Sequence, residues 1–220
     1  RSYENAEKPF NQLILAQITD NELGMINKTE GIFANTRNFM GIDWGKGEKS
    51  STVVTIFSYN IITGKYQMLY CKKYRTSEEL EPEYQVKDIA NMMTLYKICY
   101  CIADWGFGFV QYRKLQQLFG TRVAACYYSF NQRQETKWDP VDQKWVVNRT
   151  KVIQNYVNFV HALSVIWPGK DKDQFPWLYD HHLAEMAEYR KSMNGRSEDL
   201  MYTHPEGQPD DGLHSCVYAH

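Results

Sequence analysis

The chain has 220 residues and a formal net charge of −1, and 43% of its residues are hydrophobic and 15% aromatic. This length fits one domain that can bury a core, and the charge argues against a protein coated in positive charge that binds nucleic acid indiscriminately. No apolar run approaches the roughly 18 residues that span a bilayer, so we expect no membrane segment. The chain begins with neither Met nor an apolar signal core. This start predicts a piece of a longer protein that is not secreted.

The cysteines are five in number and show no CxxC spacing. They stand in apolar contexts such as YKICYCIAD, which favours buried thiols in a reducing cytosol over disulfides. They are Cys71, Cys99, Cys101, Cys126 and Cys216.

The first part of the chain, residues 1–36, is polar apart from the apolar patch LILAQI at residues 13–18. It predicts a tail or linker with one helix. Strand signals then follow at residues 37–44, 52–59 and 66–74. These runs are rich in β-branched and aromatic residues and are bounded by turn residues, which indicates an antiparallel three-strand meander.

The hydrophobic period then changes to that of a helix. Residues 83–97 place Val86, Ile89, Met93 and Tyr96 at spacings of three and four. The short apolar run YCIA at residues 100–103 is typical of a buried strand. The remaining predicted elements are a helix at 109–119, a strand at 123–129, a helix at 151–163 capped by Asn148 or Thr150, a helix at 176–191 and a last helix at 210–219.

Residues 131–150 predict a β-hairpin inserted before a helix, with Trp138 and Trp145 on either side of the turn DPVDQK. Basic residues outnumber acidic ones here, which favours contact with a phosphate backbone. A solvated hairpin with scattered charges is the alternative. The basic residues are Arg133, Lys137, Lys144, Arg149 and Lys151, of which Arg149 and Lys151, at a helix start, are the strongest candidates.

Carboxylates stand at three element boundaries. Asp43 ends the first strand of the meander, Asp104 follows YCIA, and Asp210 and Asp211 begin the last helix. Functional groups emerge at such ends of an α/β sheet. A carboxylate among apolar neighbours is costly unless it is paired or binds a cation, and hard divalent cations relieve the repulsion within a cluster of acids.

The chemistry that uses such a cluster is phosphodiester hydrolysis with two Mg²⁺ or Mn²⁺ ions. In this interpretation Asp43 bridges the two ions, with Asp104 on one and Asp211 on the other. Each acid also has an ordinary alternative, a helix N-cap for Asp210 or Asp211 and a turn for Asp43 or Asp104. The conjunction of three acids at three element ends favours the metal site.

Three motifs carry a resemblance to a known family: GIDWGKGEKSSTVVTIFSY, CIADWGFG and HPEGQPDDGLHSCVYA. Over residues 37–220 the chain resembles the C-terminal nuclease domain of the large terminase subunit of tailed bacteriophages. The resemblance implies a ribonuclease H-like α/β fold, related to Holliday-junction resolvases. Its central mixed sheet has three antiparallel strands followed by parallel strands, is flanked by helices and carries the inserted hairpin.

The resemblance also implies an activity and partners. Such a domain is an endonuclease that cuts concatemeric double-stranded viral DNA during packaging, with little sequence specificity. An ATPase domain, joined here through residues 1–36, the portal and the small terminase subunit would be its partners. The location would be the host cytoplasm, at the procapsid portal.

Carried over by position, Asp43 and Asp104 match the first two metal ligands of the family. Asp211 and His214 match the two polar groups three residues apart at the last helix start, and this spacing points both into one site. A second acid commonly stands where this chain has His214. The choice between Asp210 and Asp211 therefore stays open, and His214 is a ligand, a proton-transfer group or a structural histidine.

Other functions are weighed against this one. A resolvase-like or transposase-like nuclease would be expected to have a more basic surface. An actin-like ATP-binding domain would use Asp43-Trp44-Gly45 to hold phosphates, but it needs two duplicated lobes and a Gly-rich adenosine loop, and the sequence shows neither. A catalytically inert DNA-binding module would lack one of the acids, whereas all three positions are filled.

Overall fold

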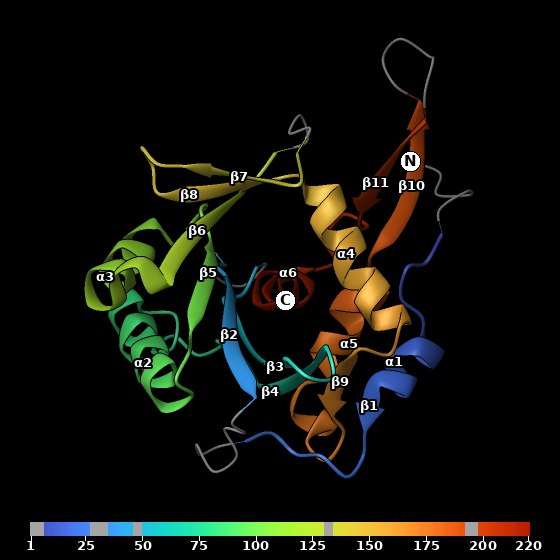
Figure 1. Cartoon of the computed structure of the whole chain (residues 1–220), viewed down its shortest axis with the longest axis horizontal. Coiled ribbons are helices and arrows are strands. Elements are labelled where there is room, and N and C mark those ends of the chain that lie inside the picture. Colours follow the sequence, from blue (N-terminus) through green and yellow to red (C-terminus); the bar gives the residue numbers. More distant parts are fainter. Residues whose placement is uncertain (1–6, 27–34, 46–49, 130–133, 192–197) are drawn as a thin grey trace.

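The computed structural model describes residues 7–26, 35–45, 50–129, 134–191 and 198–220. Within these ranges the strands form a nine-stranded sheet in the order β1-β9-β4-β3-β2-β5-β6-β8-β7 and a two-stranded ribbon, β10-β11 (Figure 1). The strands are β1 (Thr19–Asp20), β2 (Thr36–Asp43), β3 (Val53–Asn60), β4 (Lys65–Lys73), β5 (Tyr100–Asp104), β6 (Val123–Tyr128), β7 (Thr136–Asp139), β8 (Lys144–Val147), β9 (Val165–Pro168), β10 (Met186–Lys191) and β11 (Glu198–Thr203). The helices are α1 (Gln12–Ile18), α2 (Pro82–Leu95), α3 (Phe109–Phe119), α4 (Arg149–His161), α5 (Pro176–Leu183) and α6 (Asp211–Ala219), with short 3-10 helices at Gly120–Arg122 and Lys172–Gln174.

The sheet is mixed, as the sequence predicted. β2, β3 and β4 form the antiparallel meander, whereas β5 and β6 continue the sheet in parallel with β2. The hairpin β7–β8 is confirmed in its described part, with Trp138 paired to Trp145. It extends the edge of the sheet, because β8 pairs in parallel with β6.

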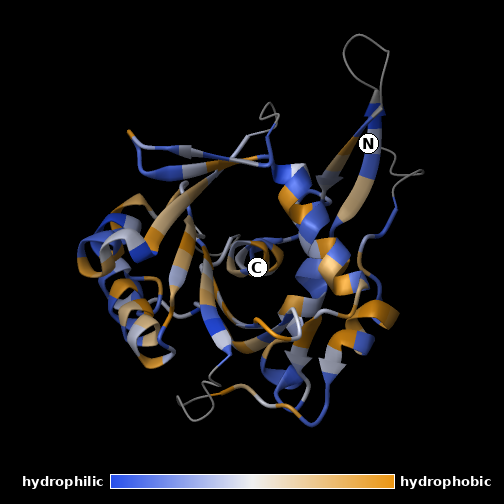
Figure 2. Cartoon of the chain, in the orientation of Figure 1, coloured by the Kyte–Doolittle hydropathy of each residue, from blue (hydrophilic) through white to orange (hydrophobic). Residues whose placement is uncertain are grey.

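Helices cover both faces of the sheet. Because successive side chains of a strand point to opposite faces, Met40 and Ile42 of β2 belong to the core under α2 and α3. Gly41, between them, lies against α6 on the other face. In Figure 1 α6 is seen nearly end-on between the sheet and the helices α4 and α5. In Figure 2 the outer helices carry hydrophilic and hydrophobic residues by turns, as expected of helices that bury one side.

The close approach of α6 depends on Gly41. A Cβ at this position would lie 2.0 Å from the carbonyl oxygen of Ser215 and 2.5 Å from the amide nitrogen of Ala219, so only glycine fits. All nine residues of α6 are buried as a result. β2 and α6, which are far apart in the sequence, are thus fixed directly against each other.

The structure corrects the expected helix at residues 176–191. α5 ends at Leu183, and the residues from Met186 onward form β10, paired antiparallel with β11. The short strands β1 and β9 at the other edge of the sheet were not predicted either.

The N-terminal segment is folded onto the domain where the structure describes it. Phe10 and Leu15 are 0% and 1% exposed, and they share a core with α4 and α5. Residues 7–26 therefore do not trail from the domain as a free tail, because the apolar patch of α1 is buried against it. The attachment of a further domain through residues 1–36 stays a prediction.

The cysteines are free, as expected, and all but one are buried; Cys99 is exposed. Among the described residues, no helix has the length and apolar character needed to cross a membrane.

Candidate metal centre beside helix α6

The register of two parallel strands brings the first two carboxylates together. β2 and β5 are neighbours, and Ile42 pairs with Ala103. Asp43 and Asp104 come one residue later on each strand, so they stand next to each other at the carboxyl edge of the sheet. Both take the face opposite to Ile42 and Ala103, which is the face that α6 covers.

The N-terminus of α6 supplies the other acids to the same place. A pocket of about 500 Å³ at this point is lined by all five residues that the sequence singled out for metal binding, together with Ser50, Phe107, Tyr128, Arg149 and His204. The five are Asp43, Asp104, Asp210, Asp211 and His214.

The acids perturb one another electrostatically. Burial raises the pKa of Asp43 well above its ordinary value, and the neighbouring charges of Asp104, Asp211 and Asp210 raise it further. Burial also raises the pKa of Asp104, although its carboxylate accepts a hydrogen bond from Gly106 N at 2.7 Å. A divalent cation would relieve both the desolvation and the repulsion, and carboxylates are the ligands that Mg²⁺ and Mn²⁺ prefer.

Asp211 is held by the loop after β2. Its Oδ1 accepts a hydrogen bond from Ser50 Oγ at 2.8 Å, and its Oδ2 accepts one from Ser51 N at 3.1 Å. These contacts fix the carboxylate toward β2 at the first residue of α6. Burial nevertheless raises the pKa of Asp211.

Asp210 lies in a different environment, among cationic and imidazole groups. Its Oδ2 is 2.8 Å from Nε2 of His214, 3.0 Å from Nδ1 of His204 and 3.7 Å from Nη2 of Arg149. Burial alone would raise the pKa of Asp210, but the charge of His214 and the contact with His204 bring it far below the ordinary value. The other ring nitrogen of His214 is 3.0 Å from the hydroxyl of Tyr128, which fixes the orientation of the imidazole.

The ligand atoms of the described residues come closest in a set that the sequence did not predict. Glu185, His204 and Asp210 offer three atoms within 4.8 Å of one another, and neither Asp43 nor Asp104 belongs to such a set among the described residues. The predicted acids thus share one pocket, and they are spaced more widely than that trio.

Glu185 gives this region a pH dependence. Its side chain is fully buried, and burial raises its pKa from 4.5 to about 7, partly offset by Arg149. Because the folded state favours the protonated form, stability is highest below pH 4.5 and falls as the pH rises through 7. In chelator, Glu185→Gln should therefore melt close to wild type at pH 5 and gain up to about 3 kcal/mol by pH 8. Thermal unfolding across this range measures the difference, and a gap that does not change with pH would contradict the assignment.

The four basic residues proposed to contact DNA occupy different places. Arg149 lines the pocket, donates to Tyr202 O, and its side chain is only 11% exposed. Lys144 of β8 is paired with Asp142 and lies over the ring of Trp105. Exposed Lys137 of β7 and Lys151 of α4 lie along the hairpin and the start of the following helix. Arg133 falls outside the described residues.

Sequence reasoning missed several residues of the pocket, above all Glu185 and His204. Glu185 stands in the run LAEMAEY, which looks like an ordinary helix surface. His204 precedes a loop with two prolines and offered a signal only through its nearness to Asp210. Gly108, by contrast, has a clear role: a Cβ there would lie within 2.2 Å of the Trp44 indole, so the two WG-containing motifs pack against each other.

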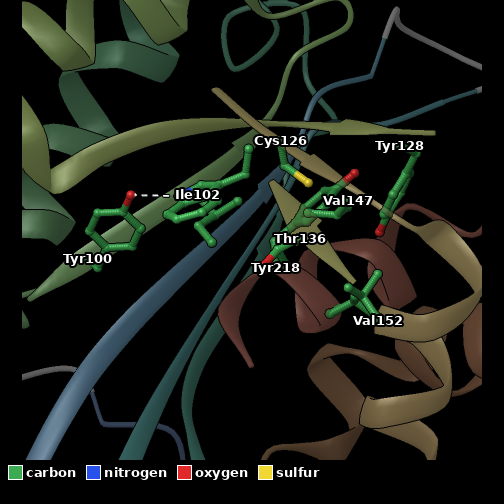
Figure 3. Close-up of a pocket in the computed structure, with 10 residues that line it drawn as sticks. Tyr100, Ile102, Cys126, Tyr128, Thr136, Val147, Val152 and Tyr218 are labelled. Atoms are coloured by element: carbon green, nitrogen blue, oxygen red, sulfur yellow. Dashed lines mark hydrogen bonds between the residues drawn. The ribbon is translucent and has the colours of Figure 1, made fainter. Parts of the chain in front are cut away.

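A second cavity, of about 280 Å³, lies between the hairpin side of the sheet and helices α4 and α6 (Figure 3). Its lining is almost entirely apolar and includes Ile102, Val147, Val152 and Tyr218. Tyr128 belongs to the lining of both cavities. The carboxylates are found in the first cavity, which is the candidate for chemistry.

Comparisons with known proteins give matches in structure. No family model and no curated protein matches the sequence. The large terminase nuclease of thermophilic phage G20c has a TM-score of 0.55 at 14% identity, covering 94% of this chain and 96% of that chain. The large terminase of another thermophilic bacteriophage has a TM-score of 0.57 at 11% identity, covering 97% of this chain and 43% of that one. The large terminase nuclease domain of bacteriophage SPP1, solved with bound Mn, has a TM-score of 0.52 at 14% identity, covering 92% and 94%.

Identities this low establish similarity of fold. The similarity extends over nearly the whole chain, and it includes the mixed sheet and the helices that carry the pocket. The chain therefore has the ribonuclease H-like fold of the terminase large-subunit nuclease domains, the family that its sequence motifs resemble.

Proposed function

We propose that this chain is a metal-dependent endonuclease that hydrolyses phosphodiester bonds of double-stranded DNA and cuts concatemeric viral DNA during genome packaging. The observation that carries the proposal is the pocket in which two adjacent strand ends and the start of α6 gather four carboxylates. The raised pKa of Asp43 supports it, because such a cluster favours a cation. The fold supports it too, since the G20c nuclease has been solved with bound magnesium and the SPP1 domain with bound Mn.

In this proposal Asp43, Asp104 and Asp211 hold two divalent cations, Mg²⁺ or Mn²⁺. Bound cations of this kind would activate the attacking water and neutralise the leaving oxygen. Ser50 and Ser51 keep the Asp211 carboxylate oriented toward β2. His214, positioned by Tyr128 and Asp210, is placed to accept or return a proton at the pocket.

The DNA backbone would approach across the mouth of the pocket. Arg149 is the one of the four basic candidates that lines the pocket itself, so we assign it the contact with the phosphate next to the cut. Lys137, Lys144 and Lys151 would contact phosphates further along the duplex. Contacts of this type give affinity without sequence choice.

The biological setting follows from the same proposal. The chain would act in the host cytoplasm at the procapsid portal, joined to an ATPase domain and assisted by the small terminase subunit. A larger whole is consistent with the second of the thermophilic phage proteins, because this chain spans 43% of that large terminase.

Supercoiled plasmid tests the proposal directly. With Mg²⁺ or Mn²⁺ the chain should produce nicked and then linear DNA, and excess EDTA should stop the reaction, because the carboxylates alone cannot activate water. Sequencing of the new ends should show little base preference. Intact plasmid under every metal condition would refute the nuclease, and a sharp consensus at the ends would refute the low specificity.

A further inference from the structure

Three segments meet at one point beside the nuclease pocket. Glu185 directly precedes β10, His204 directly follows β11, and Asp210 directly precedes α6. The antiparallel pairing of Met186 with Thr203 places Glu185 and His204 at the same end of the ribbon. Their ligand atoms and one carboxylate oxygen of Asp210 lie within 4.8 Å of one another.

Glu185 is the most unusual member of this trio. It is 0% exposed, and neither of its carboxylate oxygens has a hydrogen-bond partner. Nη2 of Arg149 is 3.6 Å from Oε1, which offers charge but is too long for a hydrogen bond. Burying a carboxylate in this way is costly, so a ligand that fills its coordination would stabilise the site.

His204 and Asp210 show the spacing of two ligands of one ion. Nδ1 of His204 is 3.0 Å from Oδ2 of Asp210, yet Nδ1 makes no hydrogen bond. Two ligand atoms that bind a metal at about 2.1 Å and at right angles are about 3 Å apart. The contact therefore has the geometry of adjacent positions in a coordination sphere.

We propose that Glu185, His204 and Asp210 form a second divalent-cation site, separate from the centre at Asp43 and Asp104, and that this site prefers Mn²⁺ to Mg²⁺. One imidazole nitrogen with two carboxylates suits Mn²⁺, whereas Mg²⁺ favours a shell made of oxygen. The ion can enter from the pocket, because His204 and Asp210 line it.

Arg149 sets the charge balance of this site. With Glu185 and Asp210 ionised and Arg149 cationic, a net negative charge remains for the ion to neutralise. The guanidinium sits at 3.6 and 3.7 Å from the two carboxylates, so it competes with the ion. The site assigns Asp210 to this second ion and leaves Asp211 for the nuclease centre.

The test counts Mn²⁺ ions on the chain by electron paramagnetic resonance, in a background of Asp43→Asn and Asp104→Asn that weakens the first centre. This background should still bind one Mn²⁺, and excess Mg²⁺ should not displace it. Adding Glu185→Gln or His204→Gln should weaken that binding at least ~10-fold. Glu188→Gln, which alters a carboxylate of β10 that faces Arg190, should leave it unchanged.

Anomalous scattering from crystals grown with Mn²⁺ would place the ion against all three side chains. A background protein that binds no Mn²⁺, or binding that survives both Glu185→Gln and His204→Gln, would overturn the site. His204 is only partly buried, so His204→Gln decides the test if Glu185→Gln fails to fold. Since the readout is binding, it is independent of whether the chain cuts DNA.

Discussion

Asp43→Asn is expected to lower metal-dependent plasmid cleavage by at least about 10³-fold, because it removes the ligand that we propose to bridge two cations, worth several kcal/mol of transition-state stabilisation. Asp43 is central in the structure as well as in the proposal, since the charges of three other acids act on it. Asp104→Asn and Asp211→Asn should cause losses of similar size. Initial rates of nicking at saturating Mg²⁺ or Mn²⁺ measure the effect.

The same variants should be at least as stable as wild type in chelator. Burial and repulsion raise the pKa of Asp43, so removing the carboxylate removes a cost to folding above its ordinary pKa. Thermal melting in EDTA separates this result from unfolding. Asp173→Asn, at an exposed carboxylate on a short 3-10 helix, is the matched control and should change neither rate nor melting temperature. Nicking at the wild-type rate by a variant would remove that residue from the mechanism.

Gly41→Ala is expected to damage stability and cleavage together. The added Cβ would collide with the backbone of α6 at Ser215 and Ala219, and overpacking of this kind costs about 1–3 kcal/mol. The relief is a shift of α6 away from β2, which moves Asp211 and His214 relative to Asp43. A displacement of roughly 1 Å at a reacting centre costs about 10²-fold in rate. Denaturant unfolding and nicking rates, measured on the same samples, test the coupling.

Gly64→Ala is the control for a glycine substitution remote from the pocket. Gly64 lies in the turn between β3 and β4 with a φ of +68°, and a Cβ there would meet nothing within 4 Å. It should cost about 1–2 kcal/mol through backbone strain alone and leave cleavage unchanged. If Gly41→Ala behaved in the same way, the position of α6 would not control the site.

Some features were written in the local sequence. Alternating and β-branched runs marked β2, β3 and β4, and the apolar run YCIA marked β5, because burial on a sheet demands those residue types. The ends of these runs also located Asp43 and Asp104. Asn148 was one of two predicted caps, and its side chain does accept a hydrogen bond from Lys151 N at the start of α4.

Other features came only from contacts between distant segments. The run MAEYRK consists largely of good helix formers and yet forms β10, because β11 offers it a complete ladder of backbone hydrogen bonds. Lys144 looked like a free cation until folding paired it with Asp142 and placed it over Trp105.

By itself the sequence determined the mixed α/β order and the positions of the acids at element ends, because hydrophobic period and turn chemistry act over a few residues. The tertiary structure alone decided how far α6 approaches β2, which carboxylate faces which partner, and that Glu185 and His204 join Asp210. These outcomes depend on side chains separated by tens of residues, whose meeting is set by strand register and helix packing. No local pattern encodes such meetings.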